Sequence, residues 1–173
     1  MNERSHAMFS FLKKKKEEAP ANTNQLKAFL SGKVIPIEEV KDPVFSAKML
    51  GNGLAIEPTS DIILAPCDGV ISTTMPDTRH AVGITAANGM EILIHEGIDT
   101  VSLKGEGFQL FVKEGDKVNA GDKLIQFDAE LIKAKGYPMT CILAVTNSDD
   151  FPDMKLHTGV EAMAGETVIV ENA

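Results

Sequence analysis

Short apolar runs rich in valine and isoleucine recur along the chain from residue 28 onward, and turn-forming Gly, Pro, Asp or Asn residues bound them. They lie at residues 34–37, 54–56, 61–64, 69–71, 90–94, 123–127, 141–145 and 167–170. Many short strands at regular spacing are typical of a closed barrel or a sandwich, because both are built from such strands joined by turns. The sequence therefore predicts an all-β domain.

One stretch has the pattern of a helix instead. Residues 129–135 are expected to form it, with Asp128 as the N-cap and Gly136 as the stop. A helix this short leaves the all-β prediction unchanged.

Composition and charge are those of one ordinary globular domain. The chain has 173 residues, of which 43% are hydrophobic and 24% are charged, and its net charge is −8. This acidic balance argues against nucleic acid as a partner, because phosphate groups would be repelled. It suits a basic protein partner, because opposite charges speed the encounter.

The first 22 residues are expected to lie outside the domain, which we assign to residues 23–173. Residues 1–7 resemble an expression-vector scar, and residues 17–24 have the composition of a linker. Between them, apolar residues 8–12 precede four lysines, which fits a solvated tail or transient contact with an anionic membrane surface. With no signal-peptide pattern and no apolar run of about 20 residues, a cytoplasmic location is expected.

Cys67 and Cys141 both lie in apolar contexts, which favours buried free thiols. A disulfide framework would need more cysteines and a secreted context.

Two of the four histidines lie at strand ends. His95 closes the apolar run 90–94 and is followed by Glu96 and Gly97, whereas His80 begins the run 80–86. The Asn-Gly pair at 88–89 predicts a hairpin, which would place both histidines at the same end of two antiparallel strands. His157, in a polar turn, is expected to be a solvated surface residue.

A pair of imidazoles supports either structural hydrogen bonding or phosphoryl chemistry. Neutral imidazole offers a nucleophilic nitrogen near pH 7, and a second ring can donate a hydrogen bond to an oxyanion. The sequence has no P-loop and no H-E-x-x-H motif. A zinc site at His80 and His95 would need a third ligand from a partner or from water. Spacing alone leaves the structural and functional interpretations open.

Four blocks of sequence, in order and spacing, resemble glucose-family enzyme IIA of the bacterial sugar phosphotransferase system. They are residues 42–53, 66–69, 80–84 and 90–108, and the last contains the specific pattern H-x-G-I-D-T-V-x-L-x-G-x-G-F. The resemblance covers roughly residues 28–171. It implies a compact antiparallel β-sandwich or barrel of the duplicated-hybrid type, with one or two short helices.

The resemblance also implies roles for individual residues. His95 is the residue expected to be phosphorylated, through Nε2. His80 is expected to hydrogen-bond the phosphoryl group, and Thr78 to orient the His80 ring. The phosphoryl donor would be HPr, and the acceptor would be the IIB domain of a membrane sugar permease. No cofactor is required for this transfer.

Four further residues match positions around that site. Asp42 and Asp99 are expected to meet the basic donor, and Phe45 and Val101 to form an apolar rim. The same rim would serve regulatory targets, which the sequence does not identify, and the sequence does not name the sugar.

Two residues beside the histidines depart from the family pattern. Glu96 replaces an apolar residue, so its charge would raise the pKa of the nearby histidines unless its side chain points away. Arg79 would then either offset that charge or bind phosphate.

Two alternative functions are weaker. A biotinyl or lipoyl carrier is suggested by residues 112–124 and by the Met-Lys pair ending at Lys155, but this lysine follows an irregular Phe-Pro stretch instead of a tight hairpin tip. A zinc peptidase on a related scaffold would need Asp at the position of Ile84 and a later H-x-H, and neither occurs.

Overall fold

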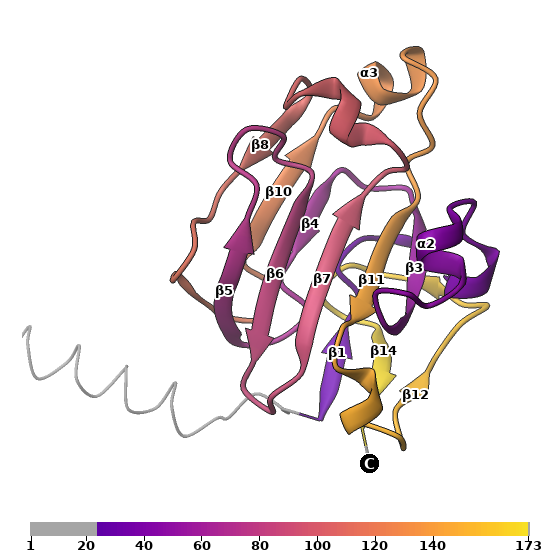
Figure 1. The fold of residues 1–173 in the computed structure, drawn as a ribbon, viewed down its shortest axis with the longest axis vertical. Helices are drawn as coiled ribbons and strands as arrows, with labels where there is room; N and C mark the ends of the chain where they lie inside the picture. Colours follow the sequence, from indigo (N-terminus) through magenta and orange to yellow (C-terminus); the bar gives the residue numbers. More distant parts are fainter. Residues whose placement is uncertain (1–23, 173) are drawn as a thin grey trace, which may run out of the picture.

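Antiparallel strands dominate the computed structural model, which describes residues 24–172 (Figure 1). The largest sheet has eight strands in the order β13-β2-β3-β11-β7-β6-β5-β9. Strands β6 and β7 form the hairpin predicted from Asn88-Gly89, and β11 pairs with the other edge of β7. The strands are β2 (Gly32–Pro36), β3 (Asn52–Pro58), β5 (Gly69–Thr74), β6 (Ala81–Ala86), β7 (Glu91–Glu96), β9 (Lys117–Val118), β11 (Cys141–Val145) and β13 (Glu161–Ala162).

Two three-stranded sheets complete the β structure. One has the order β4-β10-β8 and the other β1-β14-β12. Figure 1 shows β4, β8 and β10 behind β5 and β6, so the first small sheet forms the second layer of a sandwich. The all-β prediction is therefore confirmed. The strands are β1 (Gln25–Lys27), β4 (Ile62–Leu64), β8 (Phe108–Leu110), β10 (Lys123–Phe127), β12 (Lys155–Leu156) and β14 (Val168–Glu171).

Strand β11 is buried along its whole length because both faces of the large sheet are covered there. Its side chains alternate between two apolar clusters, as the two-residue period of a strand requires. Cys141, Leu143 and Val145 belong to the main core, whereas Ile142 and Ala144 belong to a smaller cluster with Phe45. This smaller cluster lies on the face of the sheet that carries the site described below.

The predicted helix is confirmed as α3 (Ala129–Ala134), and the Asp128 side chain accepts a hydrogen bond from the Leu131 amide at 3.1 Å. A second helix, α2 (Pro43–Ser46), is one turn long and is capped by Asp42. It is too short to show a helical period in the sequence. Three short 3₁₀ helices are η1 (Ile37–Glu39), η2 (Thr100–Leu103) and η3 (Ser148–Asp150).

The two cysteines are buried and free, as predicted. Burial, assisted by the neighbouring Asp68, raises the pKa of Cys67 to about 12. His157 is not simply solvated, since its Nε2 lies 2.7 Å from the Glu171 carboxylate on β14. The sequence pattern did not reveal this contact, because it depends on the antiparallel pairing of β12 with β14.

The predicted vector-derived residues and tail at 1–22 lie outside the described residues, as does the basic run at 13–16. The domain boundary at residue 23 therefore stays a prediction. Among residues 24–172, no helix has the length and apolarity needed to cross a bilayer.

Candidate functional site

The hairpin of β6 and β7 brings the two histidines together. Ala81 pairs with His95 across the strands, and the Glu96 amide donates to the His80 carbonyl at 2.7 Å. Both histidines therefore lie at the end of β7, the strand whose arrowhead can be followed in Figure 1. The hairpin prediction is confirmed, and the Asn-Gly turn needs its glycine because Gly89 has a φ of 93°.

The two imidazole rings meet edge to face. Their centroids are 4.7 Å apart, with an angle of 88° between the ring planes. His80 is only 3% exposed, whereas His95 is partly exposed. The Phe45 ring lies 5.1 Å from the His95 ring, so His95 has an apolar wall on one side.

Hydrogen bonds fix the orientation of each ring through Nδ1. His95 Nδ1 lies 2.9 Å from the Gly97 carbonyl oxygen. A carbonyl can only accept, so the neutral ring carries its proton on Nδ1 and leaves a lone pair on Nε2. His80 Nδ1 lies 2.9 Å from the Thr78 hydroxyl, as expected for a residue that orients this ring.

Burial keeps both imidazoles neutral at pH 7. It lowers the pKa of His80 to about 4, with a further contribution from His95. Burial also lowers the pKa of His95, against the opposing effects of the Gly97 carbonyl, Asp42 and Asp99. Since a protonated imidazole has no free lone pair, a lowered pKa preserves the nucleophilic form.

The acidic residues predicted near the site influence it from two different elements. Asp42 caps α2 by accepting from the Val44 amide at 2.9 Å. Asp99 directly precedes η2 and has the left-handed backbone conformation, with φ of 61°. Both carboxylates partly oppose the lowering of the His95 pKa by burial.

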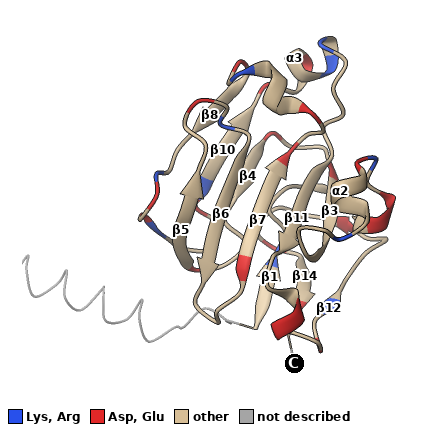
Figure 2. Cartoon of the chain, viewed as in Figure 1, with Lys and Arg blue, Asp and Glu red and all other residues tan. Residues whose placement is uncertain are grey.

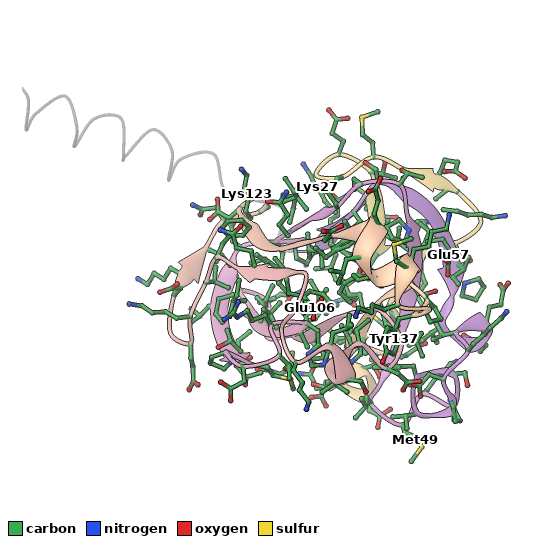
Figure 3. All side chains as sticks on the ribbon, turned by 90° about the horizontal axis from the view of Figure 1, so that it is seen from above. Lys27, Met49, Glu57, Glu106, Lys123 and Tyr137 are labelled. Atoms are coloured by element: carbon green, nitrogen blue, oxygen red, sulfur yellow. The ribbon has the colours of Figure 1, made fainter. Side chains whose placement is uncertain are left out.

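Apolar side chains are exposed around α2 and on η2. Val101, the predicted rim residue, is 50% exposed, and Val44 is 40% exposed. Met49 is 72% exposed, and Figure 3 shows its side chain projecting away from the body of the protein. This surface has the character of a docking rim, apolar with acidic residues beside it.

Glu96 points away from the histidines into the main core. It shares a face of β7 with Ile92 and Ile94 and is fully buried, while His95 faces the opposite side. Figure 2 shows β7 as a strand with acidic residues at both ends among mostly uncharged neighbours. Of the two possibilities that the sequence leaves open, the structure selects the one in which Glu96 does not face the site.

Arg79 does not pair with Glu96. It is exposed, and its Nε donates to the Pro76 carbonyl at 3.1 Å within its own loop. Its backbone is left-handed, with φ of 57°, immediately before His80. The predicted offset of charge is therefore wrong, because Glu96 is buried on the far side of the strand.

Two groups that fix His95 are not evident from the sequence. The Gly97 carbonyl accepts from the imidazole, and the buried Thr100 hydroxyl donates to the Glu96 carbonyl. Every residue has a carbonyl, so nothing in the sequence singles out that of Gly97. Within residues 24–172, no group of three or more His, Cys, Asp or Glu side chains could hold a metal ion.

Comparison with known proteins matches residues 24–151 to the family described as phosphoenolpyruvate-dependent sugar phosphotransferase system, EIIA 1. The glucose-specific EIIA component of Bacillus cereus is 46% identical over 150 residues, which cover 87% of this chain and 90% of the relative. That of Halalkalibacterium halodurans is 45% identical over 164 residues, covering 94% of each chain. The solved structure of glucose permease IIA from Mycoplasma capricolum superimposes with a TM-score of 0.73 at 37% identity, covering 84% of this chain and 94% of that one.

Proposed function

Since this chain belongs to the EIIA family of the phosphoenolpyruvate-dependent sugar phosphotransferase system, and so carries phosphoryl groups during sugar uptake, we propose that His95 is the residue that carries them. The observation that supports this most strongly is the hydrogen bond from His95 Nδ1 to the Gly97 carbonyl, which leaves the Nε2 lone pair free. The neighbouring His80 ring, 4.7 Å away, then serves as the group that stabilises the phosphoryl oxygens.

In the proposed transfer, the Nε2 lone pair of His95 attacks the phosphorus carried by a phosphohistidine of HPr. A bond forms between Nε2 and phosphorus while the donor's nitrogen–phosphorus bond breaks, and the electron pair returns to the donor imidazole. The proposal assigns His80 the tautomer in which its Nδ1 accepts from the Thr78 hydroxyl, 2.9 Å away, so that Nε2 carries a proton for a phosphoryl oxygen. Donor and acceptor are both imidazoles, so the exchange is nearly balanced.

A component of this system interacts in general with HPr and with a permease partner. We assign the contact to the apolar rim around α2 and η2, with Asp42, Asp99 and Val101 as its proposed residues. Phe45, the fourth predicted residue, is only 5% exposed and would act as the apolar wall beside His95. The carboxylates would attract the basic donor, and the apolar residues would exclude water from the phosphoryl group. The proposed acceptor is a IIB domain, and regulatory targets would compete for the same rim.

The test is incubation of the full chain with phosphoenolpyruvate, enzyme I and HPr, followed by mass spectrometry. The expected product carries one phosphate, which is lost in acid because a phosphohistidine is acid-labile. An acid-stable phosphate, or none, contradicts the proposal.

Replacing His80 by glutamine is expected to leave acceptance intact but slow onward delivery to the permease by roughly 10- to 100-fold, the range expected for a lost transition-state hydrogen bond. Glutamine has an amide donor but no ring nitrogen for Thr78 to hold, so the donor is no longer fixed in the direction of the phosphoryl group and its hydrogen bond in the transition state is weakened. Single-turnover transfer to a IIB domain measures the rate, and delivery at the wild-type rate would refute the assisting role.

Neither alternative function is favoured. Lys155, the carrier lysine of the biotinyl or lipoyl alternative, begins the two-residue strand β12 and pairs with Glu171, so it does not lie at a hairpin tip. Zinc binding stays a proposal in which His80 and His95 supply two ligands and a partner or water supplies the rest. A cytoplasmic location also belongs to the proposal, because phosphoenolpyruvate is made in that compartment.

A further inference from the structure

The turn that follows β7 places the carbonyl that holds His95. Gly97 is left-handed with φ of 81°, and the left-handed Asp99 follows two residues later. A left-handed conformation is strained at a residue other than glycine, so this turn needs contacts that hold it in place. Any change in the Gly97 peptide plane moves the acceptor of the His95 Nδ1 proton.

Two backbone carbonyls and the Thr100 side chain are among the groups that hold this turn. The Gly97 amide donates to the Thr140 carbonyl at 3.0 Å, and the Ile98 amide donates to the Pro138 carbonyl at 3.1 Å. The Thr100 hydroxyl donates to the Glu96 carbonyl, which closes the turn across residues 96–100. Thr100 is fully buried, so water cannot replace its hydroxyl in this bond.

Thr100 also packs directly against Gly97. A Cβ atom at Gly97 would come within 2.3 Å of Thr100 Cγ2 and 3.0 Å of Thr100 Oγ1. The threonine side chain therefore fills the space beside the Gly97 peptide, and its hydroxyl bonds to the peptide before it. Both contacts restrict the direction of the Gly97 carbonyl.

We propose that Thr100 is a positioning residue for phosphoryl transfer, acting through the Gly97 carbonyl to keep the proton of His95 on Nδ1 and the lone pair on Nε2. The proposal rests on the function assigned to His95 above. Thr100 itself touches neither reacting atom, since its hydroxyl is committed to the Glu96 carbonyl. Without that hydroxyl the turn relaxes, the Nδ1–H loses its fixed acceptor, and the imidazole populates the tautomer in which Nε2 is protonated.

The test compares Thr100→Val, which removes the hydroxyl at nearly constant shape, with Thr100→Ser, which keeps it. Nitrogen-15 chemical shifts of the His95 ring at pH 7 report the tautomer without any phosphoryl donor. We expect Thr100→Val to shift His95 toward the Nε2–H tautomer and to slow acceptance from HPr roughly tenfold, and Thr100→Ser to restore both. Thr85→Val is the matched control, because that hydroxyl donates to Glu91 at the other end of the same hairpin.

An unchanged tautomer in Thr100→Val overturns the proposal, and so does an equal shift in Thr100→Ser, which would assign the effect to packing. If valine prevents folding, Thr100→Ala removes the hydroxyl without adding a methyl group beside Gly97. This outcome can be told apart from failure of the function proposed for His95. If that function is wrong, phosphate appears on another residue, whereas the nitrogen-15 measurement uses no phosphoryl donor and still tests the role of Thr100.

Discussion

Replacing His95 by alanine is expected to abolish phosphoryl acceptance from HPr, with no phosphate detectable by mass spectrometry. The reason is that no other described nucleophile occupies the site. His80 is 3% exposed and directs Nδ1 to Thr78, and both thiols are buried in the core. The fold should persist, because His95 is partly exposed and packs against the rim and not in the main core.

The matched control is His157→Ala, which removes a histidine that pairs with Glu171 away from the site. It should accept one phosphate at the wild-type rate. If His95→Ala were phosphorylated to the same extent as His157→Ala, the carrier residue would have to be sought elsewhere.

Replacing Glu96 by valine is expected to stabilise the protein at pH 7 by about 2–3 kcal/mol. Glu96 is fully buried, and among the described residues neither carboxyl oxygen has a hydrogen-bond partner of good geometry. The Cys141 thiol lies opposite it on β11. Burial, reinforced by the charge of Glu57, raises the pKa of Glu96 well above 4.5, although the thiol opposes the shift.

Because the pKa of Glu96 is raised in the folded protein, the free energy of unfolding should depend on pH. A carboxyl group whose pKa is higher in the folded state favours folding most below its unfolded pKa near 4.5, and this contribution is lost as the pH rises toward the folded pKa. Between these two values the free energy of unfolding should fall by up to about 1.4 kcal/mol per pH unit through this group alone.

Urea denaturation from pH 5 to pH 8 measures this slope in the wild type and in Glu96→Val. The valine variant should lose the slope, and Glu161→Val, the same change at an exposed position on β13, should retain it. Equal slopes in all three proteins would mean that Glu96 is ionised in the folded state. Phosphoryl acceptance should be unchanged by Glu96→Val, because its side chain faces away from His95.

Local signals in the sequence were sufficient for the parts of the site that depend on neighbouring residues. The Asn-Gly turn predicted the hairpin, and strand pairing then required His80 and His95 to share one end of the sheet. The Asp128 cap likewise predicted the start of α3, and the apolar neighbours of both cysteines predicted that these thiols are buried. The hairpin depends on a two-residue turn, and the helix cap depends on residues three positions apart. The burial of the cysteines follows from their apolar sequence neighbours.

Features that depend on what covers a surface could not be predicted in this way. Strand alternation places His95 and Glu96 on opposite faces, but only the packed sandwich shows that both faces are covered at this point. The His157–Glu171 pair joins elements whose proximity depends on the pairing of β12 with β14. Helix α2 is one turn long, so only the Asp42 cap and Pro43 at its first position mark its start, and no helical period follows them.

The atom that carries the phosphate tests the central claim most directly. Nitrogen-15 and phosphorus-31 NMR of the phosphorylated chain, labelled at histidine, identifies both the residue and the ring nitrogen. The structure leads us to expect a single phosphohistidine with phosphorus on Nε2 of His95, since Nδ1 is committed to the Gly97 carbonyl at 2.9 Å. Phosphorus on Nδ1, or on any residue other than His95, would contradict this assignment.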